Sequence, residues 1–101
     1  MARLHGWLYT YEDAMDPRGE GPSQVAYDTV EEAWRAAGEA AEYLAKTDLR
    51  DIKWPEDAPG PTMLREIVEA ARRGDWRAAF EGWQEYHGEY SHDISISVEP
   101  I

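Results

Sequence analysis

The chain of 101 residues carries 21 acidic against 10 basic side chains, a formal net charge of −11, and it contains no cysteine. A chain of this length holds one hydrophobic core, so we expect residues 1–101 to form a single domain. Without cysteine, disulfides, thiolate metal ligands and cysteine nucleophiles are excluded. The longest basic run is Arg72-Arg73, which disfavours direct nucleic-acid binding because neutralising phosphates requires clustered cations.

The cellular environment is also constrained by composition. A small domain without disulfides is typical of the reducing cytoplasm. The first residues, Met1 to Gly6, contain no apolar stretch of the signal-peptide type, and no segment approaches the length needed to cross a membrane. We therefore expect a cytoplasmic protein without a membrane partner.

The N-terminal region predicts a β-hairpin. Residues Arg3–Tyr11 are rich in aromatic and aliphatic side chains, which is typical of a strand. Residues Glu12–Ser23 contain two prolines and two glycines and predict a loop. Residues Gln24–Tyr27 predict a second strand that pairs with the first.

A helix is predicted from Thr29 to Ala45 or Lys46. Thr29 and Glu32 have the spacing of a capping box, in which a hydroxyl and a carboxylate satisfy free backbone N–H groups. Apolar residues then recur at the helical period. Two i,i+4 ion pairs are expected on the opposite face: Glu31–Arg35 and Glu42–Lys46.

Two shorter helices are predicted after a second loop. Residues Thr47–Pro61 contain three prolines and a glycine, which exclude regular structure. Thr62 is expected to cap a helix that ends at Gly74, and Asp75 to cap the next one. We expect the two helices to form an antiparallel hairpin.

The third helix carries an apolar stripe. Trp76 and Trp83 lie on it, and Trp34 lies on the stripe of the first helix, so all three are expected in the core. The stretch GDWRAAFEGWQEY resembles the centre of a tetratricopeptide-type helical hairpin. It does not repeat, and such solenoids need about three repeats to bury their core, so the resemblance implies a local helical hairpin and no function.

The chain closes with the strongest strand pattern. In His92–Glu99, Ile94, Ile96 and Val98 alternate with polar residues, as in a strand with one buried face. Because the first and last strands both need partners, we expect them to lie side by side. The predicted fold is α+β: two or three antiparallel strands packed by three helices, in the order β-(β)-α-α-α-β.

No motif for catalysis, a metal or a cofactor is evident. Ser91, His92 and Asp93 are triad residue types, but neighbours on a strand point to opposite faces and cannot form a relay with one another. An acidic and histidine-containing cluster spans Glu85–Asp93, yet its spacing matches no metal motif. We expect no metal, no cofactor and no enzymatic activity, with a small metal-dependent enzyme using this cluster as one alternative.

Acidic residues concentrate in the two predicted loops. Asp13, Asp16 and Glu20 lie in the first loop, and Glu56 and Asp57 lie in the second. If these loops are contiguous, their carboxylates would stand in for phosphates and attract a basic protein surface. The alternative is that the acidity only keeps the protein soluble.

Aromatic residues are the second candidate for binding. Trp7, Tyr9 and Tyr11 share one face of the first strand, and this face is either an exposed aromatic strip or covered by the first loop. Trp54, in the second loop, is either an anchor for a partner or folded back onto the core.

These features favour a non-enzymatic, acidic binding protein that occupies a basic or nucleic-acid-binding surface of a partner protein. Phage-encoded inhibitors of host defence, including anti-CRISPR proteins, are often equally short, acidic and free of catalytic motifs. That analogy rests on size and charge, with no matching residues. A small structural or regulatory module acting as a homodimer through its sheet is the main alternative.

Overall fold

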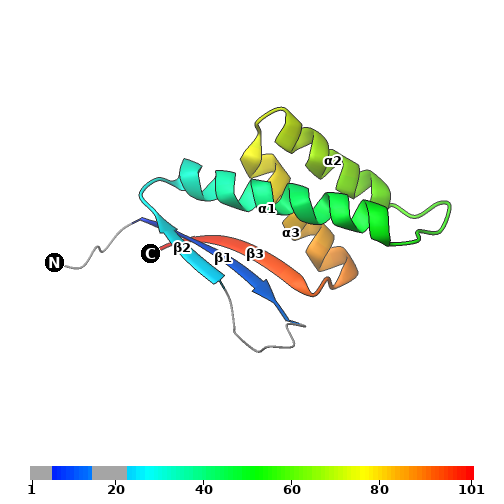
Figure 1. Ribbon diagram of the computed structural model, residues 1–101, viewed down its shortest axis with the longest axis horizontal. Helices are drawn as coiled ribbons and strands as arrows, with labels where there is room; N and C mark the ends of the chain where they lie inside the picture. Colours follow the sequence, from blue (N-terminus) through cyan, green and yellow to red (C-terminus); the bar gives the residue numbers. More distant parts are fainter. Residues whose placement is uncertain (1–5, 15–22) are drawn as a thin grey trace.

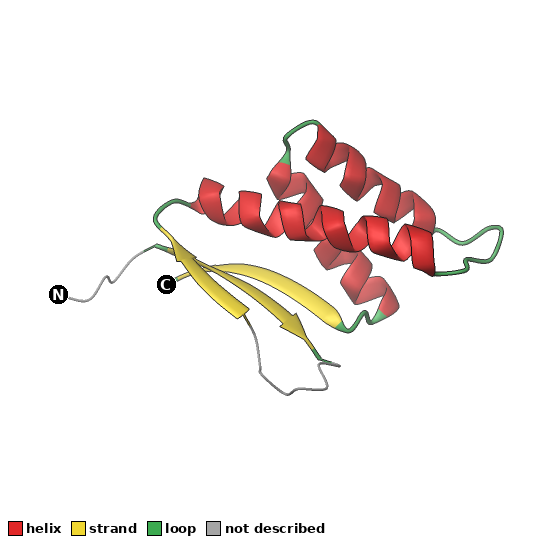
Figure 2. Cartoon of the chain, viewed as in Figure 1, coloured by secondary structure: helices red, strands yellow, loops and turns green. Residues whose placement is uncertain are grey.

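The computed structural model describes residues 6–14 and 23–101. The three strands form one antiparallel sheet in the order β2-β1-β3, and the three helices cover one of its faces (Figures 1 and 2). The predicted α+β fold, its element order and the neighbouring first and last strands are confirmed. The elements are β1 (Trp7–Asp13), β2 (Ser23–Tyr27), α1 (Val30–Asp51), α2 (Gly60–Arg72), α3 (Trp76–Tyr90) and β3 (Ile94–Pro100).

The aromatic side of β1 is the inner face of the sheet. Tyr9 lies opposite Val98 of β3 and Val25 of β2 in the strand register. Tyr9 and Val98 both pack against the helical core, as does the buried Ile96. Because side chains alternate along a strand, Leu8, Thr10 and Glu12 of β1 face the other way. The sheet therefore has one face under the helices and one polar face away from them.

The first helix is longer than predicted. It continues to Asp51, so the prediction of a loop from Thr47 is wrong. The Thr47 hydroxyl donates a hydrogen bond of 2.9 Å to the Tyr43 carbonyl inside the helix, and the next residue, Asp48, is buried. Leu49 also packs against the core. Polar residues that suggested a helix end are thus accommodated within the last turns.

The second helix begins before the predicted cap. Its N-cap is Pro59 and its first residue is Gly60, so Thr62 lies inside the first turn and does not cap the helix. Pro61 is tolerated there because its missing N–H is one that lacks a helical partner in any case. The Asp75 cap of α3 is confirmed by a bond of 3.2 Å from the Ala78 N–H to the Asp75 carboxylate.

Small residues allow α1 and α3 to approach closely. A Cβ added at Gly38 of α1 would lie 2.6 Å from the backbone oxygen of Trp76. Alanines line the buried side of α1 around this contact, and the largest fully buried side chains come from the other two helices. Those alanines are Ala33, Ala37, Ala41 and Ala45, and the large side chains are Leu64, Ile67, Trp83 and Tyr86.

The three tryptophans expected in the core differ in depth. Trp83 is fully buried, but Trp34 and Trp76 are only partly buried at the edge of the core. Each edge ring is covered by an arginine from the opposite helix, with Arg77 4.6 Å from the Trp34 ring centroid and Arg35 5.9 Å from that of Trp76. Such cation–π contacts shield an aromatic face without burying it.

The ion pairs along α1 are partly as expected. Lys46 lies 3.4 Å from Glu42, as predicted. Arg35 pairs with Glu39 at 2.9 Å instead of Glu31, because the side chain that lies over Trp76 reaches the acid one turn later. Glu31 is in the first turn, where a carboxylate interacts favourably with the helix N-terminus.

The close contact at Gly38 can be tested against a second helical glycine. Gly38→Ala should lower the free energy of unfolding by about 1–3 kcal/mol, since backbone or side chains must shift to admit the methyl group. Gly88→Ala, with nothing within 4 Å of the added Cβ, should raise it by about 0.5–1 kcal/mol through helix propensity. Denaturant titration measures both, and equal effects would contradict the helix contact.

Candidate interaction surface

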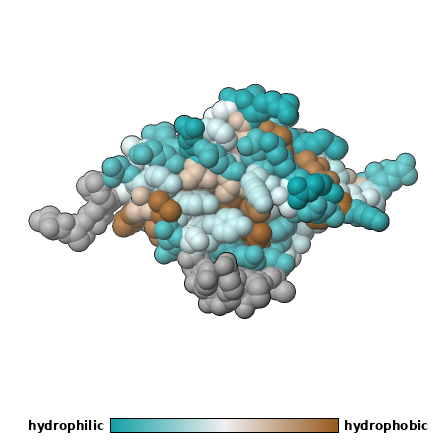
Figure 3. All heavy atoms as spheres, in the orientation of Figure 1, coloured by the Kyte–Doolittle hydropathy of each residue, from teal (hydrophilic) through white to brown (hydrophobic). Residues whose placement is uncertain are grey.

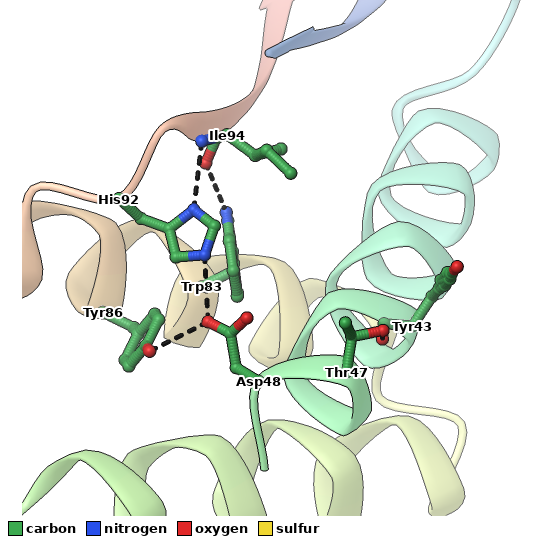
Figure 4. A network of polar contacts seen from close by, with 7 residues as sticks. All are labelled: Tyr43, Thr47, Asp48, Trp83, Tyr86, His92 and Ile94. Carbon is green, nitrogen blue, oxygen red and sulfur yellow. Dashed lines mark hydrogen bonds and ion pairs between the residues drawn. The ribbon is translucent and has the colours of Figure 1, made fainter. Parts of the chain in front are cut away.

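A buried carboxylate joins three elements at one end of the fold. Asp48 Oδ2 on α1 accepts a hydrogen bond of 2.9 Å from the Tyr86 hydroxyl on α3 and lies 2.9 Å from His92 Nε2 (Figure 4). His92 Nδ1 accepts the Ile94 N–H at 3.0 Å, and Trp83 Nε1 donates to the Ile94 carbonyl at 3.1 Å. The start of β3 is thereby fixed to both helices.

This network has the composition of a catalytic relay but not its geometry. Because His92 Nδ1 accepts from a backbone N–H, Nε2 carries the proton that it donates to Asp48. Both ring nitrogens are therefore engaged, and neither faces a nucleophile as a general base must. Ser91 is an exposed residue in the left-handed region (φ 51°) that ends α3. The arrangement serves to hold the chain.

The Glu85–Asp93 cluster does not form a metal centre in this geometry. Among the residues that the structure describes, no three histidine or carboxylate side chains are grouped as ligands for one ion. Glu85, Glu89 and Asp93 are exposed, whereas His92 is turned inward to Asp48. The inward position of His92 separates its ring from the exposed acids of this cluster.

Trp54 is folded back onto the core. Its ring makes edge contacts with Tyr86 (6.3 Å between centroids) and Tyr90 (5.3 Å), and a Cβ added at Gly60 would collide with it. The folded-back alternative therefore describes this residue, and it is not an exposed anchor. Its Nε1 and the Tyr90 hydroxyl are buried without a hydrogen-bond partner within the described part of the chain.

Trp54 packs against the last turns of α3, and exposed acids follow Trp54 in the chain and lie on those turns. Glu56 and Asp57 follow Trp54 and are exposed. Glu85 and Glu89 are exposed on the last turns of α3, against which Trp54 packs, and Asp93 is exposed just after the helix. We call these five residues the acidic pole.

The first loop starts at the same end. Asp13 lies opposite Ile94 in the register of β1 and β3, and the Ala14 N–H donates to the Asp93 carbonyl at 2.9 Å. Asp13 is the last residue of β1 and is half-buried, so the prediction that it lies in the first loop is wrong. It borders Asp93 of the acidic pole. Asp16 and Glu20 lie outside the described residues.

The aromatic face of β1 lies under the helical layer. Tyr9 and Tyr11 are half-buried and pack against the core, and Trp7 is half-buried as well. Of the two alternatives, an exposed strip does not describe these half-buried residues, because the helices cover their face of the sheet. Cover by the first loop concerns residues 15–22, which lie outside the described residues. Burial raises the pKa of Tyr9 to about 12, with Tyr11 and Tyr27 contributing.

Sequence reasoning missed an exposed extension of this face. Tyr43 on α1 is 62% exposed and Val25 on β2 is 45% exposed. Tyr43 is near Tyr11, whose pKa is raised by burial and further by Asp13 and Tyr43. In Figure 3, apolar and pale aromatic side chains fill the band between α1 and the sheet. An aromatic residue on the otherwise polar stripe of α1 was the available signal for Tyr43.

Comparisons with protein-family models, with curated proteins and with solved structures gave no match. Within the described residues, no helix is long and apolar enough to span a membrane. The surface of the described residues is therefore the basis for the proposed function.

The Asp48 anchor predicts a large effect of one substitution. Asp48→Ala leaves the Tyr86 hydroxyl and the His92 N–H buried without their acceptor, which should reduce the free energy of unfolding by about 1–3 kcal/mol for each group. Asp51→Ala, which removes an exposed pair with Arg50, should leave the melting temperature unchanged. Equal melting temperatures for the two variants would contradict the anchor.

The buried tyrosines predict a loss of stability in alkali. Burial raises the pKa of Tyr86, and its hydrogen bond to Asp48 raises it further, while the pKa of Tyr9 is about 12. Unfolded tyrosines ionise near pH 10, so unfolding releases protons above that pH. Stability is full below about pH 10 and falls as pH rises toward the folded values. Melting temperatures measured from about pH 9 upward should fall less steeply for Tyr86→Phe than for the wild type.

Proposed function

We propose that this protein is a non-enzymatic, cytoplasmic binding protein that uses its acidic pole to occupy a basic, nucleic-acid-binding surface of a partner protein. The observation that carries the proposal is that exposed acids of three segments flank, along the chain, the contact of Trp54 with the end of α3 and the turn before β3. Glu56 and Asp57 come from a loop, Glu85 and Glu89 from α3, and Asp93 from the turn before β3. Together they present carboxylates where a nucleic acid would present phosphates.

The charges of the acidic pole are not neutralised by the protein itself. None of its five acids forms an ion pair with a lysine or arginine within the described residues. By contrast, five acids on the helices do: Glu39, Glu42, Asp51, Glu69 and Glu81 pair with Arg35, Lys46, Arg50, Arg72 and Arg77. The five charges of the acidic pole are thus available to a basic partner.

The helix α3 reinforces this negative potential. The C-terminus of a helix carries a partial negative charge from its unpaired carbonyl groups, and α3 ends at Tyr90 between Glu89 and Asp93. At the other end of the molecule, Glu31 and Glu32 lie in the first turn of α1, where the helix dipole has the opposite sign and offsets them. The electrostatic potential is therefore more negative at the acidic pole than at the start of α1, and the acidic pole attracts cations more strongly.

The same geometry supports a role without catalysis. His92, which is partly buried, has both ring nitrogens engaged, and the Asp48 carboxylate beside it is shared by two donors. Competition with nucleic acid for a basic channel would make the protein an inhibitor, in keeping with the size and charge that it shares with phage-encoded inhibitors of host defence.

The proposal is tested by two variants of equal net charge. The first carries Glu56→Gln, Asp57→Asn, Glu85→Gln and Glu89→Gln, and the control carries Glu31→Gln, Glu39→Gln, Glu69→Gln and Glu99→Gln. Each loses the same number of negative charges from the formal net charge of −11. Immobilised wild type is used to capture basic nucleic-acid-binding proteins from lysate, and the purified captured protein is then used for kinetics.

We expect association to slow at least tenfold for the first variant and less for the control, because charge steers association over a screening length of about 8 Å at physiological ionic strength. The wild-type on-rate should fall as salt rises, and double-stranded DNA should compete for the partner. Equal on-rates for the two variants, or a partner that binds DNA and this protein simultaneously, would refute the proposal.

A further inference from the structure

We propose that β2 pairs in antiparallel fashion with β2 of a second copy of this chain, joining two sheets into one continuous sheet. The inference does not depend on the proposed function, because it uses a sheet edge and not the acidic pole. β2 pairs with β1 along one of its two edges, and the proposal gives its other edge a partner.

The two edges of the sheet differ in their protection. On β3, α1 and α3 both pack against the strand, which ends in Glu99 and Pro100. A charge and a proline are common means of blocking further strand addition. On β2, Ser23–Tyr27 contains neither a charge nor a proline, and its outer side meets no strand among the described residues. An unprotected edge offers free N–H and C=O groups to another strand.

The sequence of β2 complements itself across a twofold axis. With the axis at Val25, Val25 lies opposite its own copy, Gln24 opposite Ala26, and Ser23 opposite Tyr27. Each larger side chain then faces a smaller one, while the two valines form the central pair. Directly opposite β-branched residues are a favourable cross-strand pair.

Local charge permits this pairing despite the net charge of −11. Among the described residues, Asp28 is the first acid that follows β2 in the chain. In the paired arrangement the two copies of Asp28 lie at opposite ends, about 20 Å apart at a rise of about 3.4 Å per residue. That separation exceeds the screening length of about 8 Å at physiological ionic strength.

Exposed apolar surface gives the pairing a driving force. Val25 points to the helix side of the sheet yet is 45% exposed, because α1 packs more over β1 and β3 than over β2. Tyr43 of α1 is 62% exposed and lies close to Tyr11 of β1. Strand pairing would remove both copies of Val25 from water at the centre of the joined sheet.

A second copy fits this edge better than a strand of the basic partner. An uncharged strand has nothing to attract cations, whereas its neutrality is what allows a strongly acidic chain to approach its own copy. A strand of five residues buries less than the roughly 1,200 Å² of a stable interface. We therefore expect a reversible dimer that forms at high protein concentration.

The test uses charge complementation at the twofold axis. Sedimentation equilibrium of the wild-type chain should show a monomer–dimer equilibrium. Val25→Lys and Val25→Asp should each raise the dissociation constant at least tenfold, because like charges face each other. An equimolar mixture of the two should dimerise again. Val25→Lys lowers the net negative charge, so general repulsion does not explain its loss of dimer.

A disulfide provides the second measurement, since the natural chain has no cysteine. Val25→Cys should cross-link to itself under mild oxidation, because residues directly opposite on antiparallel strands have Cα atoms about 4.5–5.5 Å apart. Ser97→Cys, on β3, should not. Circular dichroism confirms that each variant is folded. A wild-type chain that stays monomeric at millimolar concentration, or equal cross-linking of the two variants, would overturn the proposal and leave the edge to a foreign strand. Neither result bears on the acidic pole.

Discussion

The fold depends on one buried carboxylate. Asp48 is removed from water, and a buried charge is strongly destabilising unless it is paired and hydrogen-bonded. Its Oδ2 meets Tyr86 of α3 and His92 before β3, so the charge is satisfied only when the end of α1, the end of α3 and the start of β3 are together. An apolar residue at this position would accept many packings, whereas a carboxylate accepts few. We infer that Asp48 selects this arrangement of helices and sheet.

The same anchor explains why acids gather at one end. Holding His92 against α1 fixes Asp93 beside the end of β1, and the packing of Trp54 on Tyr86 and Tyr90 brings in the second loop. Like charges placed together reduce stability, and nothing in the packing requires them to be acidic. Under the proposed function, the charges of this surface serve binding and not folding.

Much of the fold is local in origin and could be predicted. The capping residues Thr29 and Asp75 and the alternation in β3 are signals within a few residues, and the structure bears them out. Asp48 could not be placed in this way, because its partner Tyr86 is 38 residues away. Locally, Thr47 and Asp48 resemble a helix end, and only the tertiary contacts show why the helix continues.

How deeply each tryptophan is buried could not be predicted from the periodicity of the sequence either. Trp34 and Trp83 both lie on apolar stripes, yet Trp83 is fully buried, whereas Trp34 is partly buried at the edge of the core with Arg77 over its ring. For the candidate site, the acids of the second loop were identified, but their proximity to Glu85 and Glu89 follows from how Trp54 packs. Helical periodicity identifies the apolar face of a helix, but it does not identify the part of the fold that covers this face.

The acidic pole and the neutral edge are compatible because of strand direction. The acidic pole lies at the end of β1 where Asp13 meets Ile94, which is also the Ser23 end of β2. In the proposed dimer Ser23 lies opposite Tyr27 of the other copy, so the two acidic poles point to opposite ends of the joined sheet. They are separated by at least the length of β2, five residues or about 17 Å, which exceeds the screening length of about 8 Å. A parallel pairing would instead place the acidic poles side by side. Antiparallel pairing through an uncharged strand is therefore the arrangement in which a chain this acidic can associate with itself and keep both acidic poles free for partners.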